Sequence, residues 1–136
     1  MLFRSGEQRG REGGKKGGQG WRKSLSMTAT QPYLSQIEAP TRAEVDALPG
    51  LTLLEFGTSW CGHCRAAQPP LAEALAPHPL LRHIKVEDGP GHALGRSLRV
   101  KLWPTLVLLQ NGQEIARVVR PTQAADLSAM LRNAAH

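Results

Sequence analysis

The chain has 136 residues, 40% of them hydrophobic, which suits a single domain with a modest core. Its formal net charge of +6 is uneven: residues 1–26 hold seven Lys or Arg and two Glu, whereas residues 27–136 hold ten Lys or Arg and nine Asp or Glu. The larger part is thus near neutral, which argues against a nucleic-acid partner. No apolar run reaches the roughly 18 residues of a membrane-spanning helix, so no membrane partner is expected.

Residues 1–30 read as a basic, glycine-rich tail. Seven of the 14 glycines lie within residues 1–26, and so few apolar side chains cannot offset the entropy of ordering, so we expect disorder. The tail lacks the apolar core of roughly 7–15 residues that marks a secretory signal, and the cytoplasm is the expected location. Gly, Lys, Arg and Glu codons are purine-rich, like a bacterial ribosome-binding site, so Met27 is an alternative start of the protein.

The following residues predict a folded domain over 31–136. Residues 33–37 suit a short strand, and the capping-box pair Thr41 and Glu44 opens a helix that extends to residue 48. The run 51–56 is too continuously apolar for a half-exposed strand. We therefore expect a central strand that is covered on both faces.

Both cysteines of the chain, Cys61 and Cys64, follow that run in a helix expected over residues 61–76. Cys61 is then at the helix N-terminus, where free backbone N–H groups and the helix dipole stabilise a thiolate, the form that attacks disulfides. Cys64 lies on the same helical face and can close a disulfide with Cys61. The pattern indicates reversible dithiol–disulfide exchange.

A structural zinc site is a weaker interpretation of the two cysteines. Structural zinc usually takes four protein ligands, but there is no second cysteine pair, and His78, His83 and His92 lack the paired spacing of a zinc finger. A merely structural disulfide is less favoured still. We expect neither a metal nor an organic cofactor.

The remaining elements complete a layered pattern. They are a central strand at 81–86, a short helix at 92–98, a hairpin of strands 105–109 and 113–119, and a last helix from Pro121 that buries Leu127, Met130 and Leu131 on one face. Asn111-Gly112 between the hairpin strands suits a type I′ turn, which needs positive φ. The order predicts an α/β fold with a mixed β-sheet and helices on both faces.

Residues 55–65, with Trp60-Cys61-Gly62-His63-Cys64 at their centre and Pro69 beyond, resemble the thioredoxin family. The Gly-His pair resembles protein disulfide isomerase domains more than ordinary thioredoxins, which carry Gly-Pro. Trp103-Pro104-Thr105 resembles the family's cis-proline loop, and Asn111-Gly112 its late hairpin. The resemblance implies a thioredoxin-like fold and a thiol–disulfide oxidoreductase.

Three residues are expected to serve the thiol chemistry besides the cysteines. His63 and Gly62 lie between the sulfurs, where an imidazolium would stabilise the thiolate and tune the redox potential; a solvated His63 with little coupling is the alternative. Glu55 lies in an apolar strand, and the resemblance makes it a buried base with a raised pKa that takes a proton from Cys64. The alternative is an exposed Glu55 at an edge. Either His83 or Lys85 takes the place of a family lysine near this acid.

The substrate side of the predicted site is formed by Trp60, Trp103, Pro104 and Arg120. Trp60 shields the cysteines, and the resemblance makes Pro104 cis and leaves the Trp103 backbone free to pair with an extended substrate; simple packing is the alternative for Trp103. Arg120 takes the place of a small family glycine, so it either blocks protein substrates or favours acidic ones such as glutathione. Gly57 replaces a family aromatic residue.

The expected partners are disulfide-containing proteins or glutathione-type substrates, together with an unidentified reductase or oxidant. We expect a monomer. The alternative function is a redox-switched binding or sensor module in which the Cys61–Cys64 disulfide changes a partner's affinity without real turnover.

Overall fold

The computed structural model describes residues 31–134, so the predictions of a disordered tail and of a start at Met27 lie outside the described residues. In chain order the elements are α1 (Arg42–Asp46), β1 (Leu51–Gly57), α2 (Gly62–Leu75), β2 (Arg82–Glu87), α3 (Ala93–Ser97), β3 (Thr105–Gln110), β4 (Gln113–Val119) and α4 (Ala124–Ala134). The capping box that opens α1 forms as predicted, with Thr41 and Glu44 each bonding the other's backbone.

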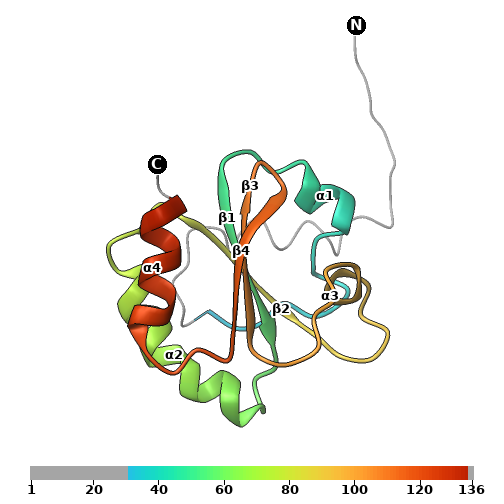
Figure 1. Ribbon diagram of the computed structural model, residues 1–136. Coiled ribbons are helices and arrows are strands. Elements are labelled where there is room, and N and C mark those ends of the chain that lie inside the picture. Colours follow the sequence, from blue (N-terminus) through green and yellow to red (C-terminus); the bar gives the residue numbers. More distant parts are fainter. Residues whose placement is uncertain (1–30, 135–136) are drawn as a thin grey trace, which may run out of the picture.

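The four strands form one mixed sheet in the order β2-β1-β3-β4. β1 is parallel to β2 and antiparallel to β3, and β4 is antiparallel to β3. Figure 1 shows α2 and α4 on one side of the sheet and α1 and α3 on the other. The predicted α/β fold with helices on both faces is therefore confirmed.

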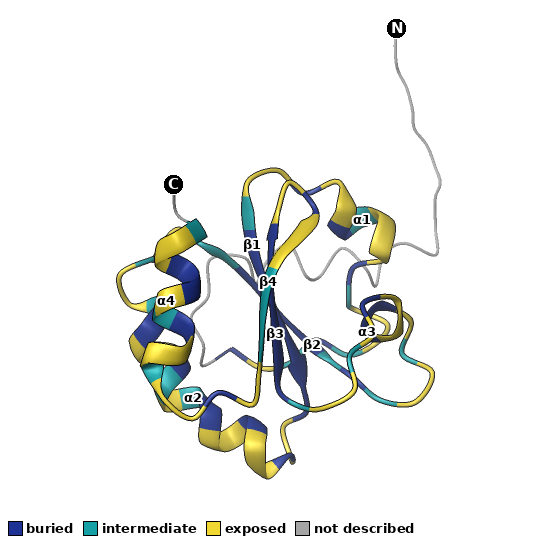
Figure 2. Ribbon diagram, viewed as in Figure 1, coloured by how far each residue is buried: buried dark blue, intermediate teal, exposed yellow. Residues whose placement is uncertain are grey.

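β1 is buried on both faces, because alternate side chains enter two different cores. Leu53 packs with residues of α2 and α4, whereas Leu54 and Phe56 pack with residues of α1 and α3. Figure 2 shows the inner strands as almost wholly buried. Glu55 shares a face with Leu53, so its carboxylate lies on the side of α2, the helix that carries the cysteines.

The prediction of a strand at residues 33–37 is wrong. Leu34 alone forms an isolated parallel bridge, with Val86. Pairing stops there because the backbone turns at once: the N–H groups of Glu38 and Ala39 both bond to the carbonyl of Ser35. The segment nevertheless places the preceding residue, Tyr33, beside the cysteine helix.

The hairpin turn is of the predicted kind. Asn111 and Gly112 have φ of 51° and 83°, as a two-residue turn of type I′ requires. A Cβ at Gly112 would also meet the backbone of Asp46, so no larger residue fits. The last helix begins at Ala124, later than predicted, and buries Leu127, Met130 and Leu131 as expected.

Candidate active site

Cys61 is the N-cap residue of α2, as predicted. Its Sγ accepts a hydrogen bond from the backbone N–H of Cys64 at 3.3 Å. Both cysteines are free thiols. Cys61 is the more accessible of the two, with 8% of the residue exposed against 1% for Cys64. The helix terminus therefore presents its N–H groups to the sulfur that an incoming disulfide can reach.

Cys64 is held as a neutral thiol. Burial raises its pKa to about 12, and the hydrogen bond and charge of the neighbouring Cys61 sulfur act in the same direction. At neutral pH this sulfur therefore keeps its proton. It becomes a nucleophile only if a nearby group accepts that proton.

A buried polar cluster lies beside Cys64, and we call it the Glu55 cluster; its members are Tyr33, Glu55, Gln68, His83 and Lys85. Glu55 is fully buried and accepts hydrogen bonds at Oε2 from the Tyr33 hydroxyl, at 2.6 Å, and from Gln68 Nε2, at 2.9 Å. His83 Nε2 lies 3.0 Å from Oε1. Gln68 Nε2 also donates to the carbonyl of Cys64, at 2.9 Å, which ties the cluster to the cysteine helix.

The predicted burial of Glu55 is confirmed, but the predicted direction of its pKa shift is wrong. Burial favours the neutral carboxyl, yet the hydrogen bond from His83, the positive charge of Lys85 and the bond from Tyr33 together outweigh burial. The pKa of Glu55 therefore lies below its ordinary value. Glu55 is a carboxylate at neutral pH, held ionised by its neighbours.

The sequence indicates either His83 or Lys85 near Glu55, and the structure places both there. Lys85 lies opposite Glu55 in the parallel pairing of β1 with β2, and His83, two residues earlier on β2, also reaches the carboxylate. Lys85 Nζ donates to Gln68 Oε1 at 3.0 Å, and burial lowers its pKa.

Sequence reasoning missed two members of the cluster, Tyr33 and Gln68. Gln68 lies four residues after Cys64 and thus on the same helical face, a spacing that points it at the same strand residue. Tyr33 had no such signal, because only the single bridge of Leu34 to Val86 places it there.

The loop before β3 carries the predicted aromatic and proline residues beside α2. The Trp103–Pro104 peptide bond is cis, as expected. The Trp103 ring meets the ring of Trp60 edge to face, with centroids 5.8 Å apart, and its Nε1 donates to Asp88 Oδ2 at 2.8 Å. Trp60 is 70% exposed, so it forms an apolar surface beside the cysteines rather than covering them.

Arg120 reaches the same loop from the end of β4. Its Nε donates to the carbonyl oxygen of Trp103 at 2.9 Å, and its backbone N–H donates to the carbonyl of Pro104. The structure thus brings Arg120 and Trp103 together. Arg120 remains exposed and adopts a φ of 52°, in the left-handed region that favours glycine.

Comparisons with known proteins agree with this geometry. A sequence model of one family, described as Thioredoxin, matches residues 36–133. The chain belongs to the thioredoxin family.

Individual relatives support the same conclusion. The structure of thioredoxin 2 from Pseudomonas aeruginosa PAO1 in its reduced form is 56% identical, covers 76% of this chain and 94% of that one, and superimposes with a TM-score of 0.69. Thioredoxin of Chlamydia pneumoniae is 38% identical over 52% of this chain and 69% of its own length. Thioredoxin H-type of Fagopyrum esculentum is 32% identical over 51% of this chain and 60% of its own length.

Thioredoxins are thiol–disulfide oxidoreductases, and this chain carries their dithiol at Cys61 and Cys64. It is therefore a thiol–disulfide oxidoreductase. Family members act on disulfide-containing proteins together with reductases. Within residues 31–134 no group of three or more His, Cys, Asp or Glu residues is placed to hold a metal ion, and no helix there is long and apolar enough to cross a membrane.

The two residues between the cysteines are open to solvent. His63 and Gly62 are exposed, and a Cβ at Gly62 would meet no atom within 4 Å. The imidazole of His63 forms no hydrogen bond with another described side chain. Any influence of His63 on the redox potential of the dithiol would therefore be electrostatic and would act without a hydrogen bond to another described side chain.

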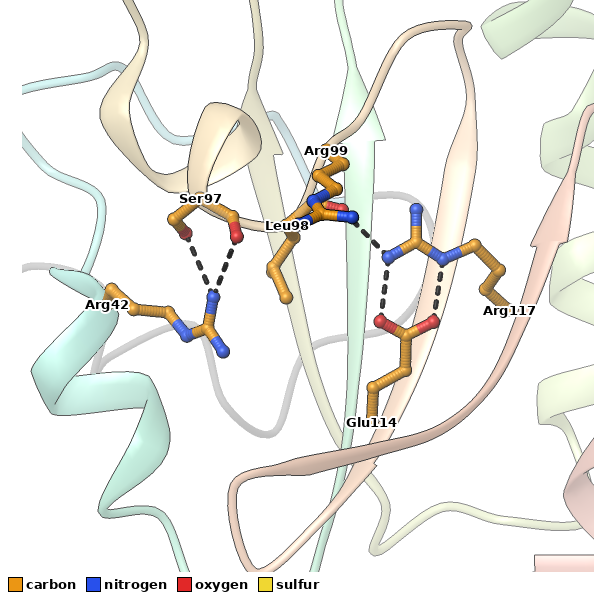
Figure 3. Close-up of a pocket in the computed structure, with 6 residues that line it drawn as sticks. All are labelled: Arg42, Ser97, Leu98, Arg99, Glu114 and Arg117. Atoms are coloured by element: carbon orange, nitrogen blue, oxygen red, sulfur yellow. Dashed lines mark hydrogen bonds and ion pairs between the residues drawn. The ribbon is translucent and has the colours of Figure 1, made fainter.

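A surface hollow away from the cysteines, drawn in Figure 3, is lined by Arg42, Arg99 and Arg117 among other residues. Arg42 donates to the carbonyl and hydroxyl of Ser97, at the end of α3. Arg117 makes two hydrogen bonds of 2.7 Å to the carboxylate of Glu114 and one to the carbonyl of Leu98. These bonds join α1 and β4 to α3 and the residue after it, so the side chains of Arg42 and Arg117 stabilise the fold.

Proposed function

We propose that Cys61 attacks the substrate disulfide and that Cys64 resolves the product. In the first step the Cys61 thiolate bonds to one substrate sulfur, and the other leaves as a thiolate. In the second step Cys64 attacks Cys61 Sγ, a Cys61–Cys64 disulfide forms, and the remaining substrate sulfur leaves. The substrate gains two electrons, and the dithiol loses them. The N-cap position of Cys61, with its hydrogen bond from Cys64 N–H, carries this assignment.

Glu55 is proposed as the acceptor of the Cys64 proton. A carboxylate with a lowered pKa is a weak base towards an isolated thiol whose pKa is about 12. The Cys64 proton becomes far more acidic, however, as the sulfur begins to bond to Cys61. Transfer is therefore proposed to accompany bond formation in the second step, which is where general-base catalysis contributes most.

The proposed substrates are extended protein segments with acid residues near the disulfide, and small disulfides such as that of glutathione that carry carboxylates. Trp60, 70% exposed, offers apolar contact beside the cysteines, and Leu102, 48% exposed, extends the apolar surface in the loop that carries Trp103. The Trp103 carbonyl is the backbone acceptor with which an extended substrate would pair, but Arg120 Nε already occupies it. A substrate carboxylate can draw the guanidinium away through a paired hydrogen bond and free that carbonyl.

The proposed setting is a reducing cytoplasm with a separate reductase as electron donor. Both cysteines belong to the redox pair, which leaves none for the structural disulfides common in small secreted domains. In that setting the dithiol of Cys61 and Cys64 is regenerated after each turnover.

Reduction of insulin disulfides by dithiothreitol tests the proposed function. The enzyme is expected to accelerate the reduction at catalytic amounts, because each Cys61–Cys64 disulfide is reduced again by dithiothreitol. A redox-switched binding module would give no acceleration. The matched control is Cys61→Ser, which keeps the fold and lacks the nucleophile.

A further inference from the structure

The Tyr33 hydroxyl lies between the two groups that the second step must connect. It donates to Glu55 Oε2 at 2.6 Å, and it lies close enough to the Cys64 thiol for each group to affect the pKa of the other. Tyr33 is partly buried, and Lys85 Nζ lies 4.6 Å from the centre of its ring. The phenol is therefore held by Glu55 and Lys85, with its hydroxyl bonded to the carboxylate and close to the Cys64 sulfur.

Gly57, at the end of β1, leaves the space in which this contact forms. A Cβ at residue 57 would lie 2.5 Å from Cys64 Sγ and 2.9 Å from the Tyr33 hydroxyl. Real Cβ atoms do not approach so closely, so any side chain at this position would drive the phenol and the sulfur apart. Gly57 therefore makes the meeting of Tyr33 with Cys64 sterically feasible.

We propose that Tyr33 carries the proton from Cys64 to Glu55 when the mixed disulfide is resolved. As Cys64 Sγ begins to bond to Cys61 Sγ, its proton passes to the Tyr33 hydroxyl oxygen, and the phenolic proton passes to Glu55 Oε2. Tyr33 ends the step neutral, Glu55 is protonated, and the substrate sulfur leaves as a thiolate. Glu55 later releases its proton to solvent, and no electron moves through the phenol.

The arrangement favours a relay over direct transfer. A phenol hydroxyl can accept one proton and donate another at the same time, whereas a carboxylate can only accept. Burial, together with Glu55, raises the pKa of Tyr33 well above its ordinary value, so the phenol itself stays protonated between turnovers. Glu55 keeps its bonds to Gln68 and His83 throughout, so it need not move to reach the sulfur.

This inference rests on the proposed roles of Cys61 and Cys64, and one experiment separates the two. The reduced protein is mixed with dithiobis(nitrobenzoate) in a stopped-flow instrument. The first coloured thiolate is released when Cys61 attacks, and the second when Cys64 resolves the mixed disulfide. If the parent protein gives no second phase, the proposed function fails; if both phases appear, the variants test Tyr33 alone.

Tyr33→Phe keeps the ring and removes the hydroxyl. The second phase is expected to slow by about 100-fold, the lower end of the contribution of a positioned proton-transfer group, while the first phase keeps its rate. The double variant with Glu55→Gln should be no slower than the slower single variant, because both act on one transfer. The control is Thr52→Val, which removes a buried hydroxyl on β1, outside the Glu55 cluster, and should leave both phases unchanged.

A second measurement needs no variant. In mixtures of light and heavy water, a step that moves two protons gives a curved dependence of rate on deuterium content, whereas a one-proton step gives a line. Curvature confined to the second phase supports the relay. A linear or absent dependence overturns it, and so does a Tyr33→Phe protein that loses stability but keeps the second-phase rate, since Tyr33 would then only fill space.

Discussion

The carbonyl oxygen of Trp103 accepts a hydrogen bond from Nε of Arg120, 2.9 Å away, beside the cysteine pair. The side chain of one residue thus occupies the backbone acceptor of another. An incoming strand must replace this bond before it can pair with the loop. Arg120 is therefore the first residue at which substrate preference can be altered without touching the dithiol.

Arg120→Gly should abolish a preference for acidic substrates. We expect the parent to reduce a disulfide peptide with acidic flanks about two- to fivefold faster than one with basic flanks, as an exposed charge pair allows. The ratio should approach one in the variant. Glycine also suits the φ of 52° at this position, so the loss of the hydrogen bond is partly offset by relief of about 1 kcal/mol of backbone strain.

Arg99→Gly is the matched control, because Arg99 is also an exposed arginine with a positive φ, of 59°. It makes no contact with the Trp103 carbonyl and should keep the parent's preference. Equal loss of preference in both variants would mean that net charge alone directs substrates, contrary to the role given to Arg120.

The two cysteines should differ sharply in reactivity. Cys61→Ser should abolish turnover, whereas Cys64→Ser should accumulate mixed disulfides, because the resolving thiol is gone. In the reduced parent, iodoacetamide near neutral pH should modify Cys61 first, since Cys64 is 1% exposed and burial raises its pKa to about 12. Peptide mass mapping after brief labelling measures the order, and earlier labelling of Cys64 would reverse the two assignments.

Glu55→Gln should destabilise the protein most at neutral pH. The folded-state pKa of Glu55 lies below its ordinary value of 4.5, so its stabilising contribution is present above that pH and is lost as the pH falls through the folded-state pKa. Loss of one partner from a buried charged network typically costs about 3 kcal/mol. Urea unfolding of parent and variant should therefore show a large difference at pH 7 that shrinks below pH 4.5.

Glu114→Gln gives the contrasting control for that experiment. Glu114 forms a surface pair with Arg117, and the hydrogen bond from Arg117 lowers its pKa as well. Because exposed pairs are screened, added salt should erase the effect of Glu114→Gln but leave the effect of Glu55→Gln. An effect of Glu55→Gln that is equally sensitive to salt would contradict the buried position of the charge.

His63→Pro should make the dithiol more reducing. His63 is the second residue of α2, and proline is tolerated in the first turn of a helix, so the fold should persist. Equilibration with glutathione measures the potential, and a shift of about 30 mV corresponds to about 1.4 kcal/mol. An unchanged potential would make His63 a solvated bystander.

The parts of the site that follow from local signals were predictable from sequence. The spacing of Cys61 and Cys64 after an apolar strand indicated the helix terminus, and Asn111-Gly112 indicated the turn. The partners of Glu55 depend instead on the register between β1 and β2. Side chains alternate between the two faces of a strand, so His83 and Lys85, two residues apart, lie on the same face of β2. Both can therefore reach Glu55, and the sequence offers no reason to choose only one of them.

The direction of the Glu55 pKa shift was not predictable for the same reason. Burial alone raises the pKa of a carboxyl, and the residues that reverse the shift come from two other segments of the chain, β2 with His83 and Lys85 and the segment with Tyr33. Tyr33 is the clearest case, because it follows Pro32 in a segment whose apparent strand ends after one bridge. Such a contact is set by tertiary packing and leaves no periodic pattern.

The position of β1 has a consequence for the dynamics of the catalytic cycle. This strand has a neighbour on each side and a core on each face, so its amide hydrogens should exchange with solvent only when the whole molecule unfolds. Glu55 belongs to that slowest-exchanging segment, whereas Trp60, Gly62 and His63 lie exposed at the edge of the fold. The proposed proton acceptor thus lies in the most protected part of the fold, whereas the residues around the cysteines are exposed, so disulfide exchange at the surface does not require the interior to open.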